Sequence, residues 1–261
     1  MENTVKYIID ANDTTVVDGV VFSRIRATRD IPLYNVRVGD KGGFVVDDTC
    51  LSHTGNCWIG ENACVAGRVK GDAYVHGNAI VCLGVRVEDH AEVFGHAIIF
   101  GGRITSRAKV YDYAKVYHSS YIHGNARVFG NSIIECVAEV FGHAMVYDYA
   151  KVTHGSKVSG NAKVYDHAEI CGEETGVTYS IVLFVGGGIV TGNAEIFGNG
   201  KVQDTAIISG NVRIHDHAIV GGNVHLNHHR CDIGGHAKFY ENADVAIAMV
   251  MNLLDSVYSA S

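Results

Sequence analysis

Histidine is the residue in this sequence that could most directly supply acid–base chemistry or metal ligands near neutral pH. The chain of 261 residues contains 15 histidines. One series places ligand-type side chains at regular intervals, at His118, Cys136 and His154. Either histidine of this series could act as a general base toward a bound substrate. A second group, HLNHHRC at residues 225–231, gathers three histidines and a cysteine, a composition that can also bind a metal ion.

Aromatic residues form a second regular series, which could contact a ligand or a protein partner. Five of them recur at nearly the same interval as the ligand-type series, namely Phe94, Tyr111, Phe129, Tyr147 and Tyr165. Two further tyrosines, Tyr113 and Tyr149, follow two positions after members of this series. Tyrosine-rich surfaces are favoured at protein interfaces. Rings on neighbouring strands can also simply stabilise one another, by about 0.2 to 1 kcal/mol per pair, and the sequence leaves both interpretations open.

These intervals follow from a six-residue repeat that runs through most of the chain. In residues 140–170 an aliphatic residue occurs at every sixth position, and a small residue, usually alanine, lies four positions after it. Alanine and the next aliphatic residue are two apart, so in a strand they share one face, while the residue between them points to the other. Pairs such as Gly-Asn and Asp-His tolerate a sharp bend. Each repeat therefore predicts one short strand and one corner, and three repeats close a triangular coil.

We expect an all-β fold, a single-stranded parallel β-helix of about ten triangular coils, each of about 18 residues. Successive coils would stack about 4.8 Å apart, with the aliphatic and alanine side chains inside. The helix is expected to cover residues 51–245, between a non-repetitive N-terminal β cap at residues 1–50 and a short C-terminal cap at residues 246–261. The two caps would close the ends of the helix, so we expect one structural domain overall.

Two local features of the sequence refine this expectation. The dipeptide Asp18-Gly19, between two apolar runs, predicts a hairpin turn inside the N-terminal cap. Near residues 173–177 the repeat is interrupted, and we interpret the interruption as a two-residue insertion after which Phe184 resumes the inward series.

The same alternation places the histidines of the repeat on the outside. Fourteen of the 15 histidines lie in the repeat, none of them at an inward position, and seven lie three positions after the aliphatic residue, where Asn and Tyr also occur. They are most simply corner residues, and residues 225–231 are then a solvated polar corner. His118 and His154 would lie two coils, about 9 to 10 Å, apart, which is too far for both to ligate one zinc ion. We therefore predict no metal site.

Composition and charge restrict the class of protein. The chain is 47% apolar and carries a formal net charge of −7, which argues against nonspecific binding of nucleic acid. The N-terminus lacks a basic stretch followed by an apolar one, and no apolar run is long enough to span a membrane. The seven cysteines show no CxxC pair, as is typical of reduced thiols. We expect a cytoplasmic protein that binds neither nucleic acid nor membrane.

One stretch resembles a known family. RIRATRDIPLYNVRVGDKGGFVVDDTCLSHTGNCWIGENA, residues 24–63, is similar to the N-terminal region of bacterial YdcK-like proteins, with GGFV, LS and GNCWI in the expected order. The resemblance implies a left-handed β-helix of the hexapeptide-repeat superfamily. That superfamily includes trimeric acyltransferases that use acyl-CoA or acyl carrier protein, whereas the YdcK-like group is assigned as a transferase by fold alone. The resemblance therefore carries over no catalytic residue.

Two function classes follow. The first is a noncatalytic scaffold without a cofactor, which binds a protein partner, itself as a dimer or trimer, or a ligand through a flat outward face. Its binding residues would be Phe94, Tyr111, Tyr113, Phe129, Tyr147, Tyr149 and Tyr165. The alternative is an acetyl-CoA-dependent acyltransferase acting at His118 or His154 in a groove between subunits. Acyltransferases of this superfamily commonly extrude a long loop from one coil, and a two-residue insertion is too short to form one.

Overall fold

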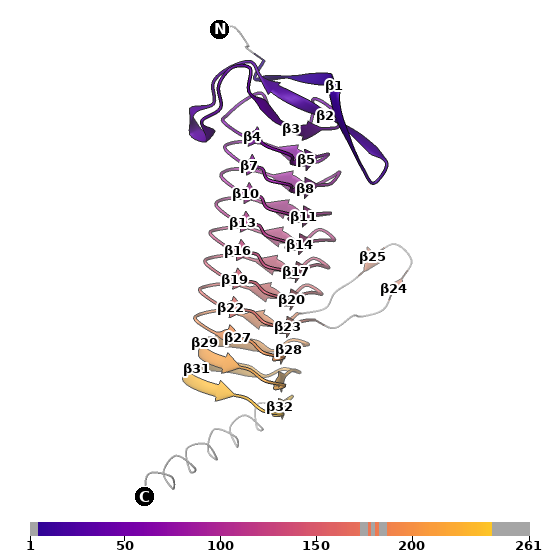
Figure 1. Ribbon diagram of the computed structural model, residues 1–261. Coiled ribbons are helices and arrows are strands. Elements are labelled where there is room, and N and C mark those ends of the chain that lie inside the picture. The colour runs from indigo at the N-terminus through magenta and orange to yellow at the C-terminus, as the bar shows by residue number, and fades with distance from the viewer. Residues whose placement is uncertain (1–4, 173–176, 179–180, 183–186, 242–261) are drawn as a thin grey trace, which may run out of the picture. The chain divides into compact units, whose positions relative to one another are not determined.

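The computed structural model describes residues 5–172, 177–178, 181–182 and 187–241. It confirms an all-β parallel solenoid of about ten turns, each of about 18 residues, with an antiparallel N-terminal region (Figure 1). The chain divides into two compact units, Met1–Glu135 and Cys136–Ser261, which we call the N-terminal unit and the C-terminal unit. The C-terminal cap expected at residues 246–261 lies outside the described residues.

The N-terminal cap is a small antiparallel sheet that turns into the solenoid. It contains β1 (Tyr7–Val17), β2 (Val20–Ala27), the 3₁₀ helix η1 (Pro32–Tyr34) and β3 (Lys41–Val45). The predicted hairpin joins β1 to β2, and Asp18 and Gly19 both have positive φ angles, of 49° and 79°. Strand β3 is antiparallel to β2 but parallel to the first solenoid strand beside it, so it is the strand at which the pairing changes direction.

The strands of the N-terminal unit form three stacks, which are the three sides of its coils. Side A continues from β3 through β5 (Cys64–Val65), β8 (Ile80–Val81), β11 (Ile98–Ile99), β14 (Lys115–Val116) and β17 (Ile133–Ile134). Side B contains β4 (Trp58–Ile59), β7 (Tyr74–Val75), β10 (Glu92–Val93), β13 (Lys109–Val110) and β16 (Arg127–Val128). Side C contains β6 (Arg68–Val69), β9 (Arg86–Val87), β12 (Arg103–Ile104) and β15 (Tyr121–Ile122).

The side chains face the interior and the solvent at the positions that the repeat predicts. Val93 and Val110 are 0% exposed, as are Ala91 and Ala108 two positions before them. Buried valine, isoleucine and alanine at these positions fill the interior at close-packed density. No described histidine is buried, so the prediction that the histidines lie outside is also confirmed.

The backbone conformation of the corners explains why one position of the repeat is occupied by either glycine or aspartate. Gly95 has a φ angle of 68°, and a Cβ there would lie 2.9 Å from the backbone nitrogen of Asp112 in the next coil. Asp112 adopts the same left-handed conformation, with φ 57°, and its carboxylate accepts a hydrogen bond from the Gly130 N–H one coil further on, at 3.2 Å. Aspartate therefore offsets the cost of a left-handed corner by satisfying a neighbouring backbone donor.

The C-terminal unit repeats this arrangement. One stack contains β20 (Lys151–Val152), β23 (Glu169–Ile170), β28 (Lys201–Val202), β30 (Ile219–Val220) and β32 (Lys238–Phe239). A second contains β19 (Met145–Val146), β22 (Lys163–Val164), β27 (Glu195–Ile196) and the end of β29 (Ile207–Ile214). The third contains β18 (Glu139–Val140), β21 (Lys157–Val158), β26 (Ile189–Val190), the start of β29, and β31 (His225–Ile233).

The predicted two-residue insertion is wrong. Asp112 and Gly130, at equivalent corners of successive coils, are 18 residues apart, whereas Glu169 and Lys201, on paired strands, are 32 residues apart. Strand β23 pairs directly with β28. The coil between β23 and β28 is therefore longer than an ordinary coil, and residues 173–186 are its additional residues.

The base of this insertion is closed by an isolated antiparallel bridge between Gly172 and Gly187. Within the insertion, β24 (Val177–Thr178) pairs antiparallel with β25 (Ile181–Val182). Phe184, which we expected to continue the inward series, lies in the insertion and outside the described residues.

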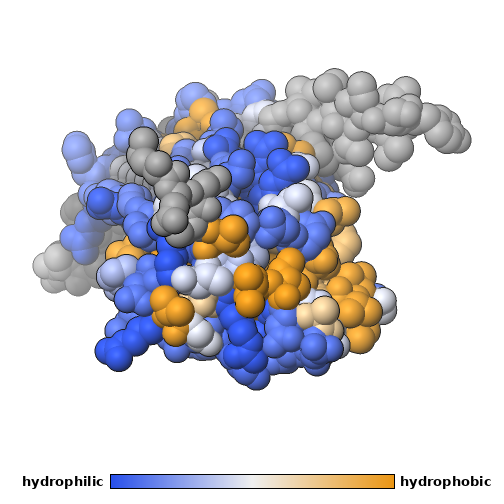
Figure 2. Space-filling model, turned by 90° about the horizontal axis from the view of Figure 1, so that it is seen from above, coloured by the Kyte–Doolittle hydropathy of each residue, from blue (hydrophilic) through white to orange (hydrophobic). Residues whose placement is uncertain are grey.

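The cap carries apolar side chains on its surface. Figure 2 looks down on the N-terminal end and shows apolar side chains interspersed with hydrophilic ones. Around the hairpin turn, Val16, Val20 and Val21 are each about half exposed or more. None of the helical structure in the described residues is long and apolar enough to cross a bilayer.

Candidate functional site

The predicted aromatic series of the N-terminal unit is a continuous stack of rings on side B. The rings of Phe94 and Tyr111 lie 4.8 Å apart and nearly parallel, at 3°, and those of Tyr111 and Phe129 lie 4.9 Å apart at 1°. The stack extends toward the cap, because the His76 ring lies 5.0 Å from Phe94. Tyr74 stacks in turn on His76, at 4.1 Å.

Face-to-face stacking determines what these rings can offer a partner. Each inner ring of the stack has both faces covered by its neighbours, so its edge is the part that points outward. A sugar ring, a base or a guanidinium group that needs a free aromatic face cannot stack on it. Burial raises the pKa of the Tyr111 phenol, which fits a side chain that is only partly exposed. The geometry therefore favours the stabilising interpretation for the inner rings.

The C-terminal unit has a ring stack of the same kind. Tyr147 lies 5.0 Å from Tyr165, which lies 5.1 Å from Phe197, and these three rings are within 6° of parallel. Burial raises the pKa of Tyr147 to about 12, and the neighbouring Tyr165 and Asp148 add to the shift. A titration of this phenol would therefore begin well above the ordinary range for tyrosine.

The two corner tyrosines are more exposed than the ring stacks. Tyr113 and Tyr149 are each 56% exposed. Tyr113 stacks on His96 at 4.9 Å, and Tyr149 stacks on His167 at 5.1 Å. Among the predicted binding residues, these two offer the largest accessible fraction of their surface.

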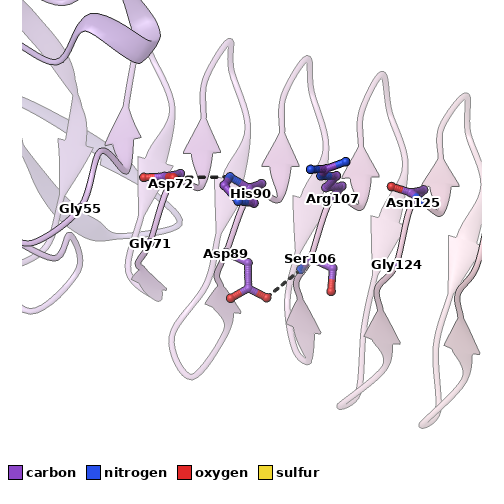
Figure 3. Close-up of a pocket in the computed structure, with 9 residues that line it drawn as sticks. All are labelled: Gly55, Gly71, Asp72, Asp89, His90, Ser106, Arg107, Gly124 and Asn125. Atoms are coloured by element: carbon purple, nitrogen blue, oxygen red, sulfur yellow. Dashed lines mark hydrogen bonds and ion pairs between the residues drawn. The ribbon is translucent and has the colours of Figure 1, made fainter.

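A groove that the sequence analysis did not identify lies beside the ring stack of the N-terminal unit. Its larger hollow, of about 630 Å³, follows the corner that precedes side B. Figure 3 shows Asp72, His90, Arg107 and Asn125 in a row, each contributed by a successive coil. A second hollow of about 480 Å³ shares the first three of these residues and extends over side B to Tyr34 of η1. The two hollows together form one groove that crosses several coils.

Most polar groups of the groove have partners that hold them in place. Asp72 lies 3.5 Å from His90 and accepts hydrogen bonds from the backbone and side-chain nitrogens of Asn56, at 3.1 and 2.9 Å. Asp89 accepts a hydrogen bond from the Ser106 N–H at 3.0 Å (Figure 3). The groove is therefore lined by fixed carboxylates with donors between them.

Arg107 differs from these groups. Within residues 5–172 and the other described segments, its guanidinium has no hydrogen bond or ion pair. The Arg107 side chain is exposed and contributes to both hollows. It is therefore a cation that a ligand carboxylate could pair with at little desolvation cost.

The floor of the second hollow contains a strongly held carboxylate. Glu92 accepts a hydrogen bond from His76 Nε2 at 3.1 Å and pairs with the ammonium group of Lys109. The hydrogen bond from His76, with the charge of Lys109, lowers the pKa of Glu92 to about 2. The carboxylate is therefore ionised under all ordinary conditions and fixes the position of Lys109 in the groove.

The candidate catalytic histidines occupy corners, as predicted. His118 is exposed, with a φ angle of 48°, and lies in the N-terminal unit. His154 is half-buried, with a φ angle of 53°, and lies in the C-terminal unit. The Nδ1 atom of His154 lies 2.8 Å from the Thr153 hydroxyl oxygen, which orients the imidazole ring. Cys136 is another left-handed corner residue, with φ 55°.

Two other groups of histidines, one in residues 225–231 and one formed by His217 and His236, are exposed. Residues 225–231 lie in the strand β31, where residues 227–230 are all exposed and the pairing with β29 shifts register. His228 accepts a hydrogen bond from the Arg230 N–H within this strand. His217 and His236 stack 5.0 Å apart at 3°. Imidazole lone pairs lie in the ring plane, so two parallel rings at this separation do not direct them at one ion.

The residues that the sequence analysis missed share one detectable signal. Four groove residues directly precede inward alanines and recur once per coil, the same periodicity that revealed the aromatic series, namely Asp72, His90, Arg107 and Asn125. Their side-chain types differ from coil to coil, so they do not form a recognisable motif. Phe197 was missed because the insertion at residues 173–186 widens its interval from Tyr165 beyond that of one ordinary coil.

Comparison of the chain with protein-family models and with curated proteins gave no match.

Proposed function

We propose that the protein is a noncatalytic binding protein that holds an extended segment of a partner protein in the groove beside side B of the N-terminal unit. The observation that carries the proposal is the pair of adjoining hollows, of about 630 and 480 Å³, which share Asp72, His90 and Arg107. Hollows of this volume are large enough to receive part of an elongated ligand. Because the groove follows successive coils, it suits an elongated ligand better than a compact one.

The chemistry of the groove favours a peptide that carries a carboxylate. Arg107 is its unpaired cation, and the fixed carboxylates of Asp72 and Asp89 can accept hydrogen bonds from peptide N–H groups or basic side chains. The ring edges of Phe94 and Tyr111 border side B and add apolar contact area without offering a stacking face. A second copy of this chain is one protein partner that such a surface could bind, as a dimer or trimer.

Selection of peptides tests the proposal. Short random peptides displayed on a particle would be selected on the immobilised full-length protein, and the affinity of the selected peptides would be measured by isothermal titration. We expect them to contain an acidic residue, and we expect Arg107→Glu to weaken their binding by about tenfold or more. Arg107 has no partner to lose, so the variant should fold as the wild type does.

A matched variant provides the control. Arg86 is an exposed arginine in β9, on side C. Arg86→Glu makes the same change of charge away from the groove, and binding should remain within about twofold of the wild type. Failure to select any binding peptide, or equal loss of binding in both variants, would contradict the proposal.

An acyltransferase is the second candidate function, and the insertion is the observation that favours it. Gly187 at the base of the insertion is so close to the preceding coil that a Cβ there would lie 2.7 Å from the carbonyl carbon of Gly155 and 2.5 Å from the nitrogen of Ser156. The insertion therefore leaves the solenoid beside the corner that contains His154. A long insertion in one coil is the feature that we expected of such enzymes, and acetyl-CoA would be the acyl donor.

The resemblance of residues 24–63 to YdcK-like proteins bears on both candidates. On that resemblance we propose a left-handed solenoid of the hexapeptide-repeat superfamily. Within the described residues no two cysteines form a disulfide, as is typical of a reducing compartment, and this supports a cytoplasmic location in the proposal.

A further inference from the structure

The N-terminal cap contains a buried lysine that contacts a buried cysteine. Lys6, directly before β1, and Cys57, directly before β4, are both 0% exposed. The Lys6 Nζ atom lies 3.0 Å from the Cys57 Sγ atom and donates a hydrogen bond to the Cys57 carbonyl oxygen at 2.9 Å. A contact with the Thr54 carbonyl oxygen, at 3.4 Å, completes the surroundings of the amine.

This pair is unusual in its electrostatics. In the described part of the chain, no carboxylate lies within ion-pairing distance of Lys6, although a buried ammonium group normally requires one. Burial lowers the pKa of Lys6, and burial raises the pKa of Cys57. Both shifts favour the uncharged amine and the uncharged thiol, and the Lys6 Nζ atom lies at hydrogen-bonding distance from the Cys57 Sγ atom.

We propose that Lys6 and Cys57 are the site of an oxidation-dependent covalent cross-link, in which one oxygen atom bridges Nζ and Sγ. A separation of 3.0 Å is close to the span of two single bonds through oxygen, so the backbone hardly needs to move. A direct sulfur–nitrogen bond would require a much closer approach of the two atoms. The proposal is independent of the groove and of the proposed function.

The oxidant is a peroxide, and the reaction balances with two equivalents. The first breaks its O–O bond, converts the thiol S–H into S–OH and releases one water. In the second step the S–OH group loses its proton, the amine loses one hydrogen, an N–O bond forms, and the second peroxide is reduced to two waters. The nitrogen–oxygen–sulfur unit is thereby oxidised by four electrons in total. Residues 54–56, directly before Cys57, are exposed, so a small uncharged oxidant approaches through this segment.

The cross-link would tie the first residues of the cap to the first coil. It joins positions 51 residues apart in the sequence. Closing a loop of this length lowers the entropy of the unfolded chain. We therefore expect the oxidised protein to melt about 5 °C higher than the reduced protein, and a thiol reductant to reverse the increase.

Mass spectrometry of the full chain tests the proposal. After treatment with hydrogen peroxide, we expect a peptide pair joining Lys6 to Cys57 with a mass gain of about 14 Da, which is one oxygen gained and two hydrogens lost. The pair should be absent from Lys6→Met and Cys57→Ser and present in Cys50→Ser, which changes another buried cysteine of the cap. The wild-type peptide map gives this answer even if a variant folds poorly. Recovery of free Lys6 together with unmodified or singly oxidised Cys57, or a direct sulfur–nitrogen link that loses about 2 Da, would overturn the proposal.

Discussion

At the scale of single residues, the position in the six-residue repeat decides what a side chain can do. Inward valine, isoleucine and alanine are fully buried, and this could be predicted from sequence because residues two apart in a strand share a face. The outward location of the histidines could be predicted for the same reason. The roles of Arg107 and Lys6 could not, because a free guanidinium or a buried amine depends on contacts between residues far apart in the chain.

The ionisation of the Glu92 carboxylate tests, at the scale of single residues, whether the polar groups of the groove are held as described. Because its pKa is lowered to about 2 in the folded protein, ionised Glu92 stabilises the fold at neutral pH. This contribution is present above the ordinary pKa of about 4.5 and is lost as the pH falls toward about 2. Glu92→Gln should therefore lower the free energy of unfolding by about 2 kcal/mol at pH 7.

Urea unfolding of Glu92→Gln and of the wild type at several pH values checks this expectation. The difference between the two proteins should shrink between about pH 4.5 and pH 2. Glu241→Gln is a suitable control, since Glu241 is exposed and the variant should show little difference from the wild type. A difference for Glu92→Gln that stays constant with pH would show that the carboxylate is not held as we describe.

At the scale of elements, the short strands and corners could be predicted, but the length of the interruption could not. Residues 173–186 contain aliphatic residues at a spacing similar to that of the repeat. The hydrophobic pattern alone therefore predicted that the inward series continues through Phe184. The pairing of Ile170 with Val202 shows that the coil instead resumes only after residue 186. The insertion forms local antiparallel pairs, which a search for parallel coils does not detect.

Deletion of residues 173–186 tests this register. Joining Gly172 directly to Gly187 brings Gly188 to the inward small position and Val190 to the next aliphatic position, and both are already buried. We expect the shortened protein to fold, with a melting temperature within a few degrees of the wild type, measured by circular dichroism. Deletion of only residues 173–184 leaves Val185 and Gly186 in the coil and should cost more stability. Unfolding of the full deletion, together with tolerance of the shorter one, would contradict the register.

At the scale of the whole molecule, the inward positions use a few small or aliphatic residue types, whereas the outward residues differ widely from coil to coil. The repeat predicted a parallel solenoid of about ten turns, which the structure confirms. The proposed function is less accessible to such reasoning, because the groove beside side B is made of unlike residues on successive coils. The aromatic series, which was the most regular outward feature, consists mainly of rings that cover one another.

Titration with acetyl-CoA tests most directly the central claim that the protein is a noncatalytic binder. Isothermal titration and thermal shift would be measured on the full chain, with acetyl-CoA up to about 1 mM, the upper end of ordinary Michaelis constants. We predict no saturable heat and no change in melting temperature. His143, an exposed histidine directly before the inward Ala144, provides the control. Saturable binding, with acetyl transfer that is lost in His154→Ala and retained in His143→Ala, would contradict the account and establish the acyltransferase instead.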